Sequence, residues 1–467
     1  MTRRPEMPAG ARASVDPATR SAPARASREE EAQRTLARTA VSRRVAWLAC
    51  GAFLLTAFSE LAVQHAVEIP RNIRARQDEI QKTGAARTSL LPRAYQVIDL
   101  LPSADQVRAV RSFSQAWDLL NTRDRIQQYT DSLKDASELW QRLSPYTQVV
   151  LTGLLGGGGN DVCVGRDGWL FYRPDLDYVI GQPFLDSSVL QRRQQSAGLN
   201  AAVDPRPAII DFARQLRARD IGLIVLPVPS KACVHPERLS SSMEVAVGAV
   251  QNASFGQFKQ DLESAGVLVF DPAEAMGAVK ADRAEAFLRT DSHWRPEAVE
   301  LVASRLAEFL RRKSSLPEGT AAYRRDARTV RNLGDIARML RLPVDCSPWT
   351  EESITIHPVT DPAGRPWRPD KRAGVLILGD SYANIYSVDG MGWGSSAGLA
   401  EQISFELQRP VDRLSRNDAG AWASRAMLSD AMAQGDDRLA GKKVVIWEFA
   451  VRELSEGDWK VIPLGKQ

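Results

Sequence analysis

Two short segments of the sequence carry an aspartate, a histidine and a serine, the three side chains that nucleophilic acyl transfer needs. The first covers residues 290–294, Thr-Asp-Ser-His-Trp, and the second covers residues 378–382, Leu-Gly-Asp-Ser-Tyr. A serine hydroxyl becomes a nucleophile when a nearby imidazole takes its proton, and a carboxylate holds that imidazole in the right tautomer and orientation. Ser381, His293 and Asp291 could fill these three roles.

His293 is the candidate base because the other three histidines lie in less suitable places. His65 ends a membrane-like segment, and His235 and His357 each directly precede a proline, which favours an extended or turn backbone. His293 instead has the carboxylate of Asp291 two residues before it and a helix start just after it.

Each segment is a weak signal when taken alone. Gly-Asp-Ser is frequent in turns, where the aspartate caps the turn and the serine bonds to the backbone. A histidine beside a helix start can simply cap that helix. Together the two segments are a stronger signal of a catalytic site, because both are expected at strand ends of one sheet.

The serine follows residues 375–378, an apolar run that predicts a strand buried on both faces. Similar runs occupy residues 221–226, 267–270 and 444–447, and helical patterns lie between them at 208–219, 255–265, 296–312, 397–407 and 421–433. This alternation predicts an α/β fold with a mostly parallel sheet covered by helices on both faces.

The carboxyl ends of parallel strands are where such sheets place their functional sites. Ser381 emerges at the end of a predicted strand, and Gly379 permits a sharp turn there, as in a nucleophile elbow that lacks the G-x-S-x-G sequence. Asp291 and His293 lie in the loop after another strand and before the helix at residues 296–312.

Four regions are expected along the chain. Residues 1–44 predict a disordered basic cytoplasmic tail, and residues 45–63 predict a transmembrane signal anchor. Residues 64–155 predict a helical spacer, and residues 156–467 predict the catalytic domain. Four glycines open this last region. A phosphate-binding loop is the alternative interpretation, but no Lys-Ser or Lys-Thr follows them, so they predict a flexible boundary.

The anchor prediction depends on residues 45–58, an uncharged apolar run that extends through residues 61–63 to about 28 Å as a helix. A buried core helix and a cleaved signal peptide are the alternatives, and an uncleaved anchor is favoured because the charged leader is too long for a signal peptide. Arg43 and Arg44 indicate a cytoplasmic N-terminus, although the arginines at positions 71, 74 and 76 weaken the charge asymmetry.

The composition argues against several other classes of protein. The net charge of +4 is small for 467 residues and the cations are dispersed, so nucleic acid is not an expected partner. The cysteines show no CxxC pair or metal-ligand spacing, so neither a metal nor another cofactor is expected. Cys163, Cys233 and Cys346 could form one disulfide or could all be free. Residues 162–165 and 169–172 predict a hairpin with Gly168 in the turn.

Five segments in this order resemble the alginate O-acetyltransferase AlgX/AlgJ-like family, whose catalytic domain is similar to SGNH (GDSL-type) hydrolases but carries its Asp-x-His before the serine. The matching residues are 164–171, 228–231, 291–294, 379–382 and 445–452. The resemblance implies that Ser381 is the nucleophile, His293 the general base and Asp291 the residue that orients it. It also implies an SGNH hydrolase-like fold and a polysaccharide acceptor.

The resemblance extends to the cellular setting. It implies an inner-membrane protein with a single membrane span and a periplasmic catalytic domain. Its expected partner is a membrane-bound O-acyltransferase that supplies acetyl groups. No carbohydrate-binding module is seen after Leu454, so we expect the catalytic domain or a partner to retain the polymer.

Further site residues are expected near the triad. The backbone amide of Ser381 and the side chain of Asn384 are candidates for the oxyanion hole. Candidates for substrate binding are Ser230, Lys231, Trp294, Tyr382, which stands where the family has phenylalanine, and Arg452. The residues at 230 and 231 could also belong to a proline-rich connecting loop.

The sequence therefore predicts an O-acetyltransferase that passes an acetyl group through an acetyl-serine onto polysaccharide hydroxyls. A carbohydrate acetylesterase with the same three residues is one alternative, because transfer and hydrolysis differ only in which hydroxyl attacks. A non-catalytic polysaccharide-binding scaffold of a secretion complex is the other.

Overall fold

The computed structural model describes residues 138–464 apart from 198–200, 242–248, 282–284 and 418–419, together with residues 65–82 and a few isolated earlier positions. The chain divides into two units, Met1–Arg142 and Leu143–Gln467. The second unit holds every candidate site residue, and α6 (Glu138–Leu155) crosses the boundary between the two. The first unit contains a helix at residues 65–82.

The predicted anchor lies outside the described residues except for Gly51, and so do the basic tail and most of the predicted spacer. Within the part of the chain that is described, no helix is both long enough and apolar enough to cross a bilayer. The anchor, tail and spacer therefore stay predictions.

Five parallel strands form the central sheet of the second unit, in the order β10, β9, β11, β3 and β4. Their bounds are Gly222–Val228 for β3, Leu268–Val269 for β4, Val375–Gly379 for β9, Asp412–Ser415 for β10 and Val444–Ala450 for β11. Every residue of β9 and β11 is buried, as expected for strands covered on both faces. The predicted α/β fold with a parallel sheet is confirmed.

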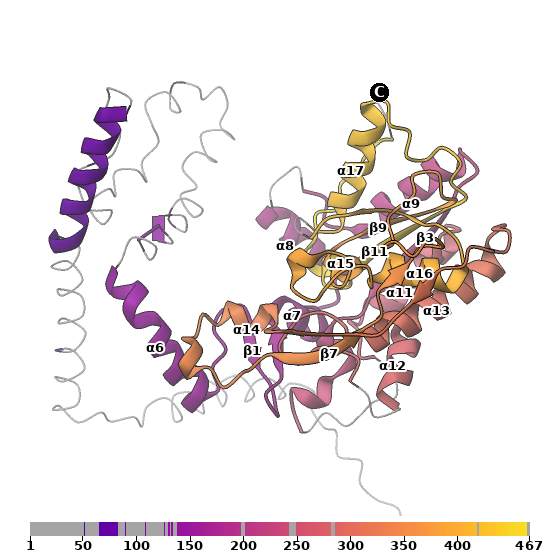
Figure 1. The fold of residues 1–467 in the computed structure, drawn as a ribbon. Coiled ribbons are helices and arrows are strands. Elements are labelled where there is room, and N and C mark those ends of the chain that lie inside the picture. The colour runs from indigo at the N-terminus through magenta and orange to yellow at the C-terminus, as the bar shows by residue number, and fades with distance from the viewer. Residues whose placement is uncertain are drawn as a thin grey trace, which may run out of the picture. The chain divides into compact units, whose positions relative to one another are not determined.

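Helices cover both faces of the sheet (Figure 1). On one face Phe212 of α9 (Pro205–Arg217) packs edge-on against Trp447 of β11 at 5.6 Å between ring centroids. Arg425 of α17 (Trp422–Ala433) lies over both of these rings. On the other face α13 packs against α12 and α16. The bounds are Ala273–Ala281 for α12, Pro296–Lys313 for α13 and Leu399–Leu407 for α16.

Two smaller parts flank the sheet. The predicted hairpin is confirmed as β1 (Val162–Val164) and β2 (Leu170–Tyr172), with Gly168 at a φ of 78° in its turn. Between α13 and β9 lies an insertion made of short antiparallel pairs and one helix. Its elements are β5 (Arg324–Arg325), β6 (Arg328–Asn332), α14 (Asp335–Met339), β7 (Glu352–Ile356) and β8 (Val359–Thr360).

The remaining elements are short connections around this core. They are α7 (Arg173–Ile180), α8 (Ser187–Ala197), α10 (Lys231–Val234), η2 (Pro236–Arg238), α11 (Phe255–Ser264), η3 (Val344–Cys346), α15 (Ser381–Asn384), η4 (Asp389–Met391) and α18 (Glu453–Glu456). The sequence did not predict α12, which separates β4 from the Asp-x-His loop. The three cysteines of this unit are free.

Candidate active site

Asp291 and His293 form a buried hydrogen-bonded pair in the loop before α13. The imidazole Nδ1 lies 2.6 Å from Oδ1 of Asp291, and both side chains are at most 5% exposed. The backbone N–H of His293 donates to the same carboxylate oxygen at 3.1 Å. Because Nδ1 faces a carboxylate, it carries the proton in the neutral ring, and Nε2 is left as the basic nitrogen. Nε2 is buried and has no hydrogen-bond partner among the residues that the structure describes.

The electrostatics of the pair suit a general base. Burial alone would lower the pKa of His293, but the hydrogen bond and the negative charge of Asp291, with that of Asp335, raise it above its ordinary value. Burial would raise the pKa of Asp291, yet the contacts with His293 and Trp393 hold it well below its usual range. Asp291 therefore stays ionised while the imidazole changes its protonation state.

Residues of the insertion hold the loop in place. Glu352 of β7 accepts hydrogen bonds from the backbone N–H of Arg289 and from both the N–H and the hydroxyl of Thr290, at 2.6 to 3.0 Å. Asp335 of α14 accepts from the N–H and the hydroxyl of Ser292 at 2.7 and 2.6 Å. Three of the four residues before His293 are thus bound to two carboxylates.

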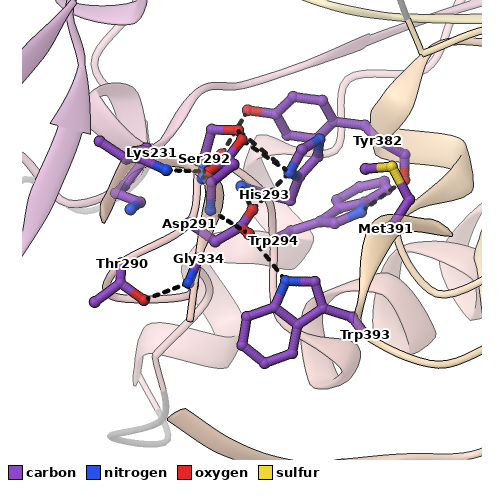
Figure 2. A network of polar contacts seen from close by, with 12 residues as sticks. Lys231, Thr290, Asp291, Ser292, His293, Trp294, Gly334, Tyr382, Met391 and Trp393 are labelled. Carbon is purple, nitrogen blue, oxygen red and sulfur yellow. Dashed lines mark hydrogen bonds and ion pairs between the residues drawn. The ribbon is translucent and has the colours of Figure 1, made fainter. Parts of the chain in front are cut away.

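Gly334 lets the start of α14 lie directly against the loop. A Cβ at this position would lie 2.3 Å from the carbonyl of Thr290 and 2.4 Å from the backbone nitrogen of Asp291. The close approach allows the N–H of Asp335 to reach Oδ2 of Asp291 at 3.0 Å. Trp393, between α15 and α16, donates its indole N–H to the same oxygen at 2.9 Å (Figure 2). Both oxygens of the aspartate are therefore fixed by N–H donors.

Ser381 opens α15 immediately after β9, at the carboxyl edge of the sheet. Asp380 caps this turn, because its Oδ1 accepts from the N–H of Tyr382 at 2.7 Å and its Oδ2 accepts from the N–H of Ala450 at 2.9 Å. A Cβ at Gly379 would lie 2.6 Å from Cβ of Ala383 and 2.9 Å from Oε2 of Glu448, so glycine allows this close packing at the turn. The predicted position of Ser381 just after the end of a strand is confirmed, and its role as nucleophile stays a prediction.

Glu448 of β11 lies fully buried below the elbow. Its Oε2 accepts from the N–H of Asp380 at 3.0 Å. Burial, together with the charge of Asp380, raises the pKa of Glu448 well above its usual range. Burial thus favours the neutral form of this side chain beneath the serine.

Tyr382 and Trp294 join the two segments that the sequence singled out. The Tyr382 ring lies 4.8 Å from the imidazole of His293 between centroids, and its hydroxyl donates to the carbonyl of Ser292 at 2.9 Å. In the other direction, the indole of Trp294 donates to the carbonyl of Tyr382 at 3.0 Å (Figure 2). Both aromatic rings are fully buried. They place the residue after Ser381 against His293, and their contact with substrate stays a prediction.

The two oxyanion candidates lie in the same helical turn. The backbone amide of Ser381 is at the first position of α15, where helix N–H groups have no acceptor within the helix. The side chain of Asn384 is 6% exposed and donates one N–H to Oδ1 of Asn417 at 2.8 Å. An amide nitrogen has two N–H donors, so one is left for a second acceptor. The oxyanion role of both groups stays a prediction.

Lys231 opens the short helix α10 at the same sheet edge, after β3, and Ser230 is the extended residue directly before that helix. The Lys231 ammonium is fully buried and donates to the carbonyls of Leu170 and Arg289 at 2.8 and 3.3 Å. Burial lowers the pKa of this lysine to about 8. Ser230 is buried with its hydroxyl 3.4 Å from Sγ of Cys233. In this structure Lys231 joins β2 to the loop that carries Asp291 and His293.

Arg452 follows β11 at this edge. Its guanidinium pairs with the buried carboxylate of Asp175 at 3.1 Å and lies over the rings of Tyr172 and Tyr382. The arginine thus contacts the residue after the serine from the side of the hairpin. Its role in substrate binding stays a prediction.

Asp291, His293 and Asp335 form a cluster whose ligand atoms all lie within 4.8 Å of one another. A metal would need lone pairs that already accept hydrogen bonds: both oxygens of Asp291 and both of Asp335 face N–H or O–H donors. The cluster therefore fits an oriented base better than a metal site.

Sequence reasoning missed three residues of this network, namely Trp393, Asp335 and Glu352. All three come from the insertion or from the loop between α15 and α16, whose local patterns carry no periodic signal. Glycines were the sequence feature that could have indicated these contacts. Gly334 directly precedes Asp335, and Gly392 and Gly394 flank Trp393, both with positive φ.

One family model and several relatives match this chain. Residues 162–451, more than half of the chain, match the family described as an SGNH hydrolase-like domain, acetyltransferase AlgX. A relative named as a probable alginate O-acetylase AlgJ, from Pseudomonas putida strain KT2440, is 28% identical over 313 residues, which is 64% of this chain and 72% of that protein.

Two solved structures resemble this chain. The O-acetyltransferase domain of Pseudomonas putida AlgJ is 25% identical, with a TM-score of 0.45 over 63% of this chain and 92% of that domain. Pseudomonas aeruginosa AlgX is 16% identical, with a TM-score of 0.42 over 63% of this chain and 66% of AlgX.

Proposed function

Because the chain belongs to the AlgX family of SGNH hydrolase-like acetyltransferases, we propose that it transfers acetyl groups onto hydroxyls of an exported or cell-surface polysaccharide. The observation that carries this proposal is the buried Asp291–His293 pair, which leaves Nε2 of the imidazole without a partner in the described part of the chain. The relative from Pseudomonas putida is named as a probable alginate O-acetylase, so alginate is the first acceptor to test.

The proposed cycle has two acyl transfers. Nε2 of His293 takes the proton of Ser381 as Oγ attacks the acetyl carbonyl of the donor, and the imidazolium then protonates the leaving group. An acetyl-serine remains. In the second transfer Nε2 takes the proton of a sugar hydroxyl, whose oxygen attacks the acetyl-serine, and the proton returns to Oγ as the ester to the enzyme breaks.

The other residues have supporting roles in this cycle. Asp291 holds the imidazole and stabilises its cation, and its low pKa keeps it ionised. The amide of Ser381 and the side chain of Asn384 would bind the oxyanion. A sugar hydroxyl held at attacking distance can outcompete water, because well-oriented groups reach effective molarities of about 10⁵ M or more against roughly 55 M for water.

We propose the cellular setting from the same family membership. The acetyl donor would be supplied by a membrane-bound O-acyltransferase, and residues 45–63 would anchor the chain in the inner membrane with the catalytic domain in the periplasm. Tyr382, Trp294 and Arg452 would shape the pocket around the acetyl-serine rather than recruit the polymer, because the first two rings are fully buried and the arginine is paired with Asp175.

The test uses the full-length protein, an activated acetyl ester, and an alginate oligosaccharide that is present or absent. Mass spectrometry follows acetyl on Ser381, free acetate and acetylated sugar. Acetylated sugar that disappears in the Ser381→Ala variant supports the proposal. Acetate release without acetylated sugar would indicate an esterase, and a protein that forms no acetyl-enzyme under any condition would point to a scaffold.

A further inference from the structure

A large cleft lies at the amino edge of the sheet, on the opposite edge from Ser381. Its volume is about 820 Å³, and residues 361–372 form most of its wall, with Tyr323 and Pro410 completing it. The N–H of Asp370 donates to the carbonyl of Val411 at 3.1 Å, just before β9 and β10 begin. The cleft is therefore separate from the site that binds the reacting acetyl group.

Most of the wall of the cleft is a loop with the sequence Arg365-Pro-Trp-Arg-Pro-Asp-Lys-Arg372. Trp367 is 5% exposed and anchors the loop, because its indole donates to the hydroxyl of Ser404 at 2.8 Å and its ring lies under Arg413. The two prolines fix φ on either side of the anchor. Arg365 and Arg368 are thus presented from a backbone that loses little entropy on binding a ligand.

Positive charge dominates the lining. Four cations and two carboxylates face the cleft, and the carboxylates of Asp361 and Asp370 already accept hydrogen bonds from backbone N–H groups of their own turns. Arg368 is exposed and forms no ion pair with the residues that the structure describes. Arg365 pairs with Asp361 through two of its nitrogens, and Lys371 pairs with Asp436; the two cations are 77% and 62% exposed. Exposed pairs contribute about 0 to 1 kcal/mol, so an anionic ligand can compete for these cations.

We propose that this cleft binds a polyanionic polysaccharide chain through its carboxylates, and so retains the polymer whose hydroxyls are acetylated at Ser381. The inference rests on the proposed function for the nature of the acceptor. Arginine matches carboxylates with paired N–H donors, and Tyr323 and the prolines supply apolar walls for sugar rings. Several cations along one loop suit a repeating anionic chain.

The concave shape favours a single glycan strand over a lipid surface. A bilayer is flat on this scale and would meet only the exposed ends of these cations, whereas a single strand can also contact the apolar walls that Tyr323 and the prolines provide. Single-strand nucleic-acid sites use several aromatic rings as stacking platforms, whereas Tyr323 is the one aromatic residue among the described residues that line this cleft. Vesicles and DNA are therefore the competing ligands in the test.

The test measures binding of the full-length protein to polymannuronate, with dextran, phosphatidylglycerol vesicles and single-stranded DNA as comparison ligands. The variants are Arg365→Ala and Arg368→Glu. The matched control is Arg214→Ala on α9, because Arg214 is also 77% exposed and also pairs with an aspartate on its own element. We expect each cleft variant to weaken polymannuronate binding about tenfold, from the loss of a charge-assisted hydrogen bond, and the control to bind like the wild type.

Acetyl transfer to a short oligosaccharide is measured on the same proteins. It should be unchanged in both cleft variants, which also shows that they fold. A wild type that does not bind polymannuronate, cleft variants that bind it normally, or equal binding of vesicles or DNA through the same arginines would each overturn the inference. If the wild type transfers acetyl and any of these binding results is found, only the inference about the cleft is refuted. If the wild type transfers no acetyl, the proposed function is refuted.

Discussion

The indole Nε1 of Trp393 donates a hydrogen bond of 2.9 Å to Oδ2 of Asp291, although 102 positions separate the two residues. The N–H of Asp335 reaches the same oxygen at 3.0 Å. Together these donors fix the rotation of the carboxylate, so that Oδ1 faces Nδ1 of His293. The orientation of the base is therefore set by residues from outside the Asp-x-His segment.

Replacement of this tryptophan by phenylalanine keeps an aromatic ring at this buried position, but it removes the N–H donor together with part of the ring. We expect Trp393→Phe to lower kcat about tenfold, because a hydrogen bond to a charged group contributes about 1.5 to 3 kcal/mol and the carboxylate can then rotate away from the imidazole. Steady-state acetyl transfer measures the effect. Trp349→Phe is the matched control, since that indole donates to the carbonyl of Gly168 at 2.8 Å away from the triad. Equal losses in both variants would contradict a role in orienting the base.

The pH dependence of the reaction should reveal the Asp291–His293 pair. His293 must be neutral to accept a proton, and its raised pKa places the acid limb of kcat/KM above the ordinary imidazole value of about 6.5. In Asp291→Asn the charge that raises the pKa is gone while the burial that lowers it remains. The limb should therefore move to lower pH, while kcat falls by about 10³-fold or more. A limb that stays in place would show that another group controls the profile.

The same pair makes a contribution to stability with a defined sign. A histidine whose pKa is raised by folding stabilises the folded state fully below its unfolded pKa of about 6.5, and this contribution is lost as pH rises through the folded value. Chemical denaturation across that window should show a falling free energy of unfolding in the wild type. The slope should be smaller in His293→Gln.

The sheet could be predicted where local apolarity is continuous. The runs that became β3, β9 and β11 are buried along nearly their whole length, and their patterns leave no other interpretation. The edge strand β10 was not predicted, because its sequence, Asp-Arg-Leu-Ser, is not a continuous apolar run. Asp412 is fully buried there, where Arg438 and Lys442 neutralise it. An ion pair between distant segments cannot be read from a local pattern.

The site could be predicted only in part, for a similar reason. Residues of the Asp-x-His loop and of the elbow stand at strand ends and helix starts, which sequence patterns locate well. The carboxylates of Asp335 and Glu352 accept hydrogen bonds from backbone N–H groups of the Asp-x-His loop. The residues next to them in the sequence give no sign of this contact. Lys231 was expected to bind substrate, but the structure shows its ammonium bonded to two backbone carbonyls.

That arrangement of Lys231 makes a kinetic prediction. Lys231→Met keeps the length of the side chain but removes the donor that joins Leu170 to Arg289, two residues before Asp291. We expect kcat to fall several-fold with KM for the polymer nearly unchanged, because the loss lies in the position of the loop. Lys280→Met is the control, since Lys280 is also mostly buried and bonds to a carbonyl and a carboxylate elsewhere. A rise in KM at constant kcat would instead indicate direct contact with the polymer.

Gly334 makes the most direct test of how the insertion positions the base. Gly334→Ala would place a Cβ 2.3 Å from the backbone of Thr290, and backbone atoms on both sides have no flexible end that can move aside. Either α14 or the catalytic loop must shift. We expect lower thermal stability and a loss of acetyl transfer larger than the loss of folded protein accounts for, because a shift of α14 withdraws the N–H of Asp335 from Asp291.

Gly256→Ala provides the control for this substitution. Gly256 lies in α11, and a Cβ there would meet no atom within 4 Å. Alanine should therefore stabilise the protein by about 0.5 to 1 kcal/mol through its higher helix propensity and leave activity unchanged. Differential scanning fluorimetry and acetyl transfer measured on both variants separate the effects. A Gly334→Ala protein with wild-type activity would show that the base keeps its orientation without close packing between α14 and the loop.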